Sequence, residues 1–155
     1  MTTTRHFESF TSARTNLRSV LDAARQGVVT TIVRDGERFV VVNAADLRGD
    51  LANLCPAKAV VSAEGGGWSA VLPDLPGRPG LPVAGEGDTF DQAIDDLVEA
   101  LREYAEDWNA RLYRAPNHRS HRTVVELVEL SSDEQLRDWI LGRDAGDGTT
   151  ALAYA

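Results

Sequence analysis

The chain has 155 residues, of which 43% are hydrophobic and 26% charged, a composition ordinary for a globular protein with one core or two small ones. Its single cysteine, Cys55, excludes an intramolecular disulfide and a thiolate zinc site, so we expect a reducing compartment. The charged N-terminus does not read as a signal peptide, and the sequence has no apolar run of about 18 residues, which favours the cytoplasm.

The net charge of −8 is unevenly distributed along the chain. Residues 1–55 carry seven arginines against six acidic residues, whereas the remainder carries nine basic residues against eighteen acidic ones. The first third is therefore compatible with a phosphate-bearing partner, and the acidic remainder suits a basic partner.

The first predicted element is an amphipathic helix within residues 9–27. Thr11 or Ser12 can cap its start, and Gly27 suits the left-handed conformation at its end. Apolar residues recur at helical spacing and are expected to face the core. They are Ala13, Leu17, Val20, Leu21 and Ala24.

The next predicted element is a β-hairpin, because Asp35-Gly36 separates two β-branched runs as a type I′ turn does. This turn sets the register and places Arg34 opposite Glu37. Both faces of the hairpin are apolar, with Ile32, Phe39 and Val41 on one and Val29, Val33, Val40 and Val42 on the other. One long helix covers only one face, so we predict a homodimer.

A short helix at residues 44–51, capped by Asn43, is expected to close this first unit. The Pro-containing stretch CPAKA, residues 55–59, is the predicted linker.

The second predicted unit is built on a β-sheet. Two strand-like runs, KAVVSAE and WSAVLPDLPG, flank a glycine turn at residues 65–67, and a third short strand is expected near residues 81–84. A long acidic helix then begins at Thr89, which forms a capping box with Gln92. Its apolar positions are Phe90, Ile94, Leu97, Leu101, Tyr104 and Trp108.

A third predicted piece follows the basic stretch that contains His118 and His121, two residues expected to be exposed. TVVELVEL, residues 123–130, has the composition of a strand. Ser131 and Glu134 form a predicted capping box for a short helix that contains Leu136, Trp139 and Ile140. Residues 145–155 have too few apolar side chains to order on their own.

Arginines in the first unit are candidate nucleic-acid contacts. Arg14 and Arg18 are one helical turn apart, and Arg34 flanks the hairpin turn. Further hydrogen-bond donors nearby are Thr11, Ser12 and Asn16. The alternative interpretation is a solvated surface in which Arg18 pairs with Asp22 and Arg34 pairs with Glu37.

Two other patterns point only weakly to chemistry. The stretches GGGW and GEGD lack the Walker spacing and a following lysine, so they indicate turns. Several carboxylates suggest a metal site, namely Asp74, Asp91, Asp95, Asp96 and Glu99. Most of them lie along one polar helix face without a histidine, which favours a solvated or partner-binding face.

Residues 7–51 resemble the N-terminal DNA-binding domain of the prevent-host-death (Phd/YefM) antitoxins. The matching features are SARTNL with Arg14 and Asn16, a glycine, the hairpin IVRDGERFVVV with Arg34, and a capped ADL. Residues 58–112 resemble the HicB antitoxin domain through GGGWSAVLPDLPG and GDTFDQAIDDLVEAL. They depart from it in a longer RPGLPVAGE stretch, with Arg78 where a small residue is usual, and in lacking a recognisable DNA-binding tail.

The two resemblances imply an α+β architecture in three parts. A Phd/YefM-like head at residues 1–54 dimerises and binds DNA, and a HicB-like β-β-(β)-α domain occupies residues 58–112. A strand–helix segment with a flexible tail, residues 113–155, is a candidate toxin-binding region.

The implied function is that of a type II antitoxin, which neutralises its toxin by direct binding and represses its own operon. Operator contacts are expected at Thr11, Ser12, Arg14, Asn16, Arg18 and Arg34. The toxin is expected to be a basic ribonuclease, contacted at Asp95, Glu99, Trp108, Tyr113 and Trp139. The resemblance implies no catalytic residue, metal or cofactor.

Two alternatives stay open from the sequence. One is a protein-interaction module whose head dimerises without binding DNA. The other is a ribonuclease-H-like, metal-dependent nuclease, which would need Asp74 and a second acid from a different element.

Overall fold

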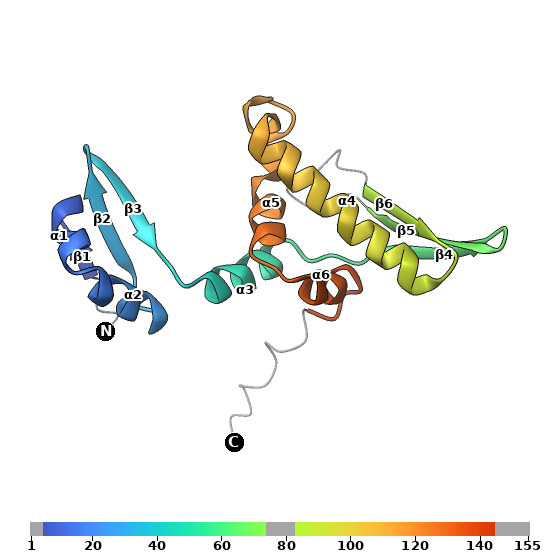
Figure 1. Ribbon diagram of the computed structural model, residues 1–155, viewed down its shortest axis with the longest axis horizontal. Coiled ribbons are helices and arrows are strands. Elements are labelled where there is room, and N and C mark those ends of the chain that lie inside the picture. Colours follow the sequence, from blue (N-terminus) through green and yellow to red (C-terminus); the bar gives the residue numbers. More distant parts are fainter. Residues whose placement is uncertain (1–4, 74–82, 145–155) are drawn as a thin grey trace, which may run out of the picture. The chain divides into compact units, whose positions relative to one another are not determined.

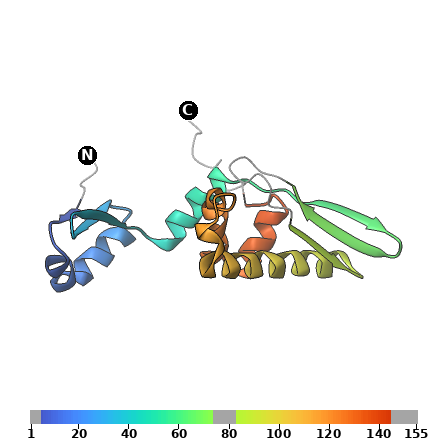
Figure 2. The ribbon, with the colours of Figure 1, turned by 90° about the horizontal axis from the view of Figure 1, so that it is seen from above.

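The computed structural model describes residues 5–73 and 83–144 (Figures 1 and 2). The chain divides into two compact units, Met1–Leu47 and Arg48–Ala155, which are described separately. None of the helices within the described ranges is long and apolar enough to cross a membrane. Asp74, Arg78 and the tail at 145–155 lie outside the described residues.

The sheet of the first unit has three strands, β1 (Arg5–Phe7), β2 (Thr30–Arg34) and β3 (Glu37–Val41). β1 pairs in parallel with β2, and β2 pairs antiparallel with β3. The predicted hairpin register is confirmed, with Arg34 opposite Glu37. The turn residues Asp35 and Gly36 have φ angles of 53° and 82°, as a type I′ turn requires.

The predicted first helix is two helices, α1 (Phe10–Thr15) and α2 (Leu17–Arg25), which meet at Asn16. Asn16 leaves the helical conformation, and its side-chain amide donates to the Ser12 carbonyl (2.9 Å). Asparagine forms such local bonds at the expense of the helix, which explains the break. The cap is Ser9, whose hydroxyl accepts from the Ser12 amide (3.1 Å), and not Thr11 or Ser12.

The buried face of these helices is formed by small residues and one valine: Ala13, Val20, Ala23 and Ala24. Leu17 and Leu21, predicted to be buried, are more than half exposed, at 53% and 55%. Small side chains let the helices lie close to the sheet, so the larger leucines remain outside. Gly27 ends α2 with a φ of 74°, as predicted.

Helix α3 (Ala44–Leu54) begins at the predicted cap, where the Asn43 side-chain oxygen accepts from the amides of Ala45 (2.9 Å) and Asp46 (3.3 Å). It runs three residues beyond the predicted end, and the division between the two units lies inside it, after Leu47. In the predicted linker, Cys55 and Ala57 are buried, so this stretch packs as part of the second unit.

The second sheet is an antiparallel meander of β4 (Val60–Glu64), β5 (Gly67–Leu72) and β6 (Val83–Gly87). Its first turn uses Gly65 and Gly66, whose φ angles of 61° and 87° favour glycine. The third strand confirms the sequence prediction within the described residues.

Helix α4 (Phe90–Ala110) lies along this sheet (Figure 2). It begins at the predicted capping box, in which both bonds between Thr89 and Gln92 are present. A Cβ atom placed on Gly85 would be only 2.3 Å from the Ala93 carbonyl oxygen and the Leu97 amide nitrogen. The helix backbone therefore contacts β6 directly, and the core between them contains Ala70, Leu72, Val83, Ile94, Leu97 and Leu101.

The predicted strand at residues 123–130 is wrong, because this stretch forms helix α5 (Arg122–Glu129). Its buried residues are Val124, Val125, Leu127 and Val128, a helical spacing and not an alternating one. Packing of this apolar face against α4 overrides the strand propensity of valine. Two short 3-10 helices, η1 (Leu112–Arg114) and η2 (Arg119–His121), connect α4 to α5.

Helix α6 (Asp133–Ile140) follows, and its apolar residues Leu136, Trp139 and Ile140 are buried. The capping box is formed by Ser132 and Gln135, one residue later than predicted. Ser131 is instead buried, and its hydroxyl donates to the Leu127 carbonyl (2.6 Å).

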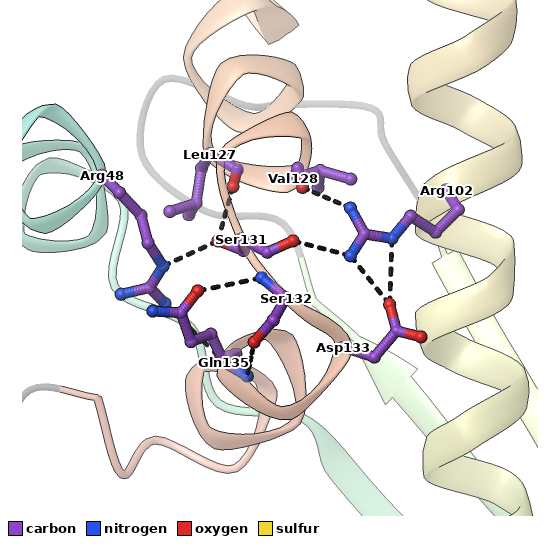
Figure 3. Close-up of polar contacts among 8 residues, drawn as sticks. All are labelled: Arg48, Arg102, Leu127, Val128, Ser131, Ser132, Asp133 and Gln135. Carbon is purple, nitrogen blue, oxygen red and sulfur yellow. Dashed lines mark hydrogen bonds and ion pairs between the residues drawn. The ribbon is translucent and has the colours of Figure 1, made fainter. Parts of the chain in front are cut away.

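Two arginines bind the junction between α5 and α6 (Figure 3). Arg48 of α3 donates to the Ser131 hydroxyl (2.8 Å) and pairs with Asp144. Arg102 of α4 donates to the carbonyls of Val128 (2.6 Å) and Ser131 (2.7 Å), and it pairs with Asp133 (2.8 Å). The two guanidinium groups thus attach α3 and α4 to the turn between α5 and α6 (Figure 3).

The close contact between β6 and α4 predicts opposite effects for two glycine substitutions. Gly85→Ala should lower the free energy of unfolding by about 3 kcal/mol or more, because backbone atoms cannot yield to the new methyl group. Gly49→Ala, within α3 and with open space around its Cβ position, should raise it by about 0.5–1 kcal/mol. Urea unfolding followed by circular dichroism measures both, and equal effects would contradict the packing argument.

Candidate functional site

The predicted nucleic-acid contacts Arg14 and Arg18 lie on either side of the break at Asn16. Arg14 is in the last turn of α1 and Arg18 is in the first turn of α2. Both are exposed, and neither forms an ion pair or a side-chain hydrogen bond with the described residues. The predicted alternative pair between Arg18 and Asp22 is not formed, so these two guanidinium groups are available to a partner.

Arg34 contacts α1, although the two are distant in sequence. Its guanidinium carbon lies 5.3 Å from the centre of the Phe10 ring, within range of a cation–π interaction. Its Nε atom is 3.4 Å from a carboxylate oxygen of Asp35, which replaces the predicted pair with Glu37. The interaction with Phe10 places Arg34 at the start of the helix that carries Thr11, Ser12 and Arg14.

The other predicted donors differ in availability. The Asn16 amide is occupied by the Ser12 carbonyl, as described above. The side chains of Thr11 and Ser12 are exposed on α1. Arg14, Arg18, Arg34 and these two hydroxyls are therefore groups of the first unit that can reach a phosphate.

The first unit also exposes large apolar side chains. Seven of them are between 43% and 61% exposed: Phe10, Leu17, Leu21, Val29, Phe39, Val40 and Val42. They include residues from both predicted faces of the hairpin. This unit therefore leaves apolar surface of the kind that a partner covers.

Most of the predicted acidic residues form ion pairs or hydrogen bonds within the second unit. Asp91 and Asp95 both pair with Arg137 of α6, the former at 2.8 Å. The Asp96 carboxylate accepts from the backbone amide of Glu86 (2.8 Å). In the described ranges no group of three or more His, Cys, Asp or Glu side chains is placed to hold a metal ion.

Two adjoining surface hollows are lined by acidic residues, and three of these, Glu64, Glu86 and Asp88, were not predicted from the sequence. The larger, about 620 Å³, is lined by residues of the sheet that include Ser62, Glu64, Trp68, Ser69, Glu86 and Asp88. The second, about 390 Å³, continues along α4 and includes Asp95, Asp96 and Glu99. Glu64 and Glu86 belong to different strands, so only the sheet pairing brings them to one surface, and this surface suits a basic partner.

The predicted aromatic contacts occupy different environments. Tyr113 is 38% exposed, and Trp108 is half-buried with its indole nitrogen donating to the His118 carbonyl (2.8 Å). Trp139 is only 1% exposed, and its indole nitrogen donates to the Cys55 carbonyl (2.8 Å). Trp139 is therefore a core residue and offers no surface to a partner.

The prediction that His118 and His121 are both exposed is also wrong. His121 is buried, and His118 is half-buried. The Tyr104 hydroxyl is hydrogen-bonded to Nδ1 of both rings, at 2.8 Å for His118 and 2.6 Å for His121. Tyr104 faces the basic stretch across the end of α4, a tertiary contact that no local pattern reveals.

No protein-family model matches this chain, and none of the curated proteins matches it. A crystal structure from Syntrophomonas wolfei subsp. wolfei, described as the antitoxin part of a candidate toxin/antitoxin system, is similar with a TM-score of 0.65 and 23% identity. The likeness covers 89% of this chain and 96% of that one, so it includes residues of both units. The shared feature is the fold, an α+β arrangement with two three-stranded sheets and helices.

Proposed function

We propose that this chain is the antitoxin of a toxin–antitoxin system, which acts in the cytoplasm by binding its toxin and by repressing its own operon. The observation that carries the proposal is the fold shared with an antitoxin across both units, at a TM-score of 0.65. The resemblance of residues 7–51 to the Phd/YefM head and of residues 58–112 to the HicB domain supports the same assignment from the sequence. Both functions require binding and not catalysis.

Operator binding is proposed for the first unit. Arg14 and Arg18 are exposed and free of carboxylates within the described residues, and Arg34 is held against α1 by Phe10. Guanidinium groups and hydroxyls of this kind contact the phosphate backbone. A two-fold dimer would present two such sets to a palindromic site.

Dimerisation is proposed through the exposed apolar surface of the same unit. Val40 and Val42, which belong to the same apolar face of the hairpin, are 61% and 43% exposed. Burial of such side chains contributes about 25 cal/mol per Å² of apolar surface removed from water. A second copy of the unit is the occupant that also provides the symmetry needed for an operator.

Toxin binding is proposed for the acidic surface of the second unit. It extends from Glu64 and Glu86 on the sheet to Glu99 on α4, and among the described residues no lysine or arginine lines either hollow. The exposed Tyr113 is retained from the predicted contact set. A toxin that binds RNA carries positive charge, so its surface complements this one.

The operator contact is tested by Arg14→Ala in the full chain, with the promoter fragment of its own gene as the probe. We expect weaker retardation of the fragment. The slope of log K against log salt concentration should fall in magnitude by about two, since a dimer loses one phosphate contact in each subunit. Arg25→Ala, which removes another exposed arginine of α2, is the control and should bind like the parent. Unchanged retardation by Arg14→Ala would favour a head that does not bind DNA.

The dimer surface is tested by Val40→Asp. A charge on this apolar face should raise the dimer dissociation constant by at least about tenfold, as measured by analytical ultracentrifugation. Val60→Asp is the matched control, because Val60 of β4 is equally exposed (63%) but belongs to the second unit. A monomeric parent, or equal dissociation of both variants, would exclude this surface.

The toxin contact is tested with the purified product of the adjacent gene, which the proposal expects to be a small basic protein. Glu99→Arg should weaken the complex by about tenfold at low salt and by less at high salt, as measured by titration calorimetry. Glu134→Arg, which reverses the charge of an exposed residue on α6, is the control and should leave the affinity near that of the parent. Absence of a complex, together with no rescue of growth on coexpression, would contradict the antitoxin assignment.

A further inference from the structure

A basic segment, residues 111–122, lies at the C-terminal end of the acidic helix α4; we call it the basic lobe. Its sequence RLYRAPNHRSHR contains four arginines, two histidines and no acidic residue. By contrast, α4 itself carries seven acidic residues and one arginine. Apart from Tyr113, which is retained above as a proposed toxin contact, the operator head and the acidic surface do not use this lobe.

The lobe is fixed to α4 by its non-arginine side chains. The Trp108 indole donates to the His118 carbonyl, and the Tyr104 hydroxyl is bonded to the rings of His118 and His121. His121 is 1% exposed. All four arginines, in contrast, are exposed on this fixed support.

Two of the four arginines form ion pairs with nearby carboxylates, so their charge is already balanced within the fold. Arg111 pairs with Asp107 (3.0 Å) and Arg122 pairs with Glu126 (2.6 Å), each one helical turn away. Arg111 also directly follows α4, where a positive charge offsets the helix dipole. Arg114 and Arg119 lie in η1 and η2, and neither pairs with a carboxylate among the described residues.

An aromatic ring lies beside one of these unpaired guanidinium groups. The guanidinium carbon of Arg114 is 5.1 Å from the centre of the Tyr113 ring, and its Nε donates to the Tyr113 hydroxyl (2.7 Å). Trp108 contacts the same ring from within the fold, with 6.1 Å between ring centres. Tyr113 nevertheless remains 38% exposed. The contact between Tyr113 and Arg114 is thus part of the fold itself.

We propose that the basic lobe binds a single-stranded nucleic acid. Arg114 and Arg119 contact its phosphates, and a base stacks against the Tyr113–Arg114 pair. A duplex fits less well, because its bases are already stacked on one another. An acidic protein segment would satisfy the guanidinium groups but would make no use of the exposed ring, so the nucleic acid is favoured.

The test measures fluorescence anisotropy of a labelled 20-nucleotide RNA of mixed sequence, with single-stranded DNA and the operator duplex in parallel. In the full chain, Arg114→Gln with Arg119→Gln should weaken RNA binding by about tenfold at low salt. It should also lower the magnitude of the slope of log K against log salt concentration by about 1.4, because two phosphate contacts to a single strand are lost. Tyr113→Ala should weaken binding by about tenfold, whereas Tyr113→Phe, which keeps the ring, should stay within about twofold of the parent.

The control is Arg25→Gln with Arg143→Gln, which changes the net charge equally at two exposed arginines outside the lobe. Equal losses in both double variants, or no single-strand binding by the parent, would overturn the proposal. Loss of protein association instead of RNA binding would identify an acidic protein partner and would also overturn it.

Binding of the operator duplex should be weakened by Arg14→Ala and not by the lobe variant, so failure of the lobe is distinguishable from failure of the operator head. Single-stranded DNA binding as strong as RNA binding supports phosphate and base recognition in general, and weaker DNA binding identifies RNA as the ligand.

Discussion

The direct contact between the backbones of β6 and α4 at Gly85 is the constraint on which the second unit depends. A side chain there would overlap the Ala93 carbonyl and the Leu97 amide, so the helix has its observed place only because this position lacks a Cβ atom. From that place, α4 presents Glu99 beside the sheet hollow and Arg102 to the turn between α5 and α6. Its far end holds the basic lobe through Tyr104 and Trp108.

Arginine has two distinct uses in this protein. Arg48, Arg102 and Arg137 are committed to carbonyls, a hydroxyl and carboxylates of the fold, and Figure 3 shows the first two on one turn. Arg14, Arg18, Arg114 and Arg119 have no carboxylate partner within the described residues. The first group satisfies polar atoms of the fold, and the second leaves guanidinium groups for the phosphate contacts proposed above.

Features encoded within a few residues were predictable. The Asp35-Gly36 turn, the Asn43 cap and the box of Thr89 with Gln92 each depend on backbone conformation and short-range hydrogen bonds, and each is present. The acidic face of α4 was also predictable from helical spacing. Its extension to Glu64 and Glu86 was not, because these residues come together only through strand pairing.

The sequence by itself determined the hairpin turn and its register, the caps at Asn43 and Thr89 and the division of charge, because these depend on neighbours in the chain. The tertiary structure decided which apolar faces are buried. Packing against α4 made a helix of residues 123–130 despite their strand propensity, and Leu17 and Leu21 stayed exposed although their spacing matched the buried residues. It also buried Trp139 and His121, since burial is a free-energy balance over contacts between segments far apart in the chain.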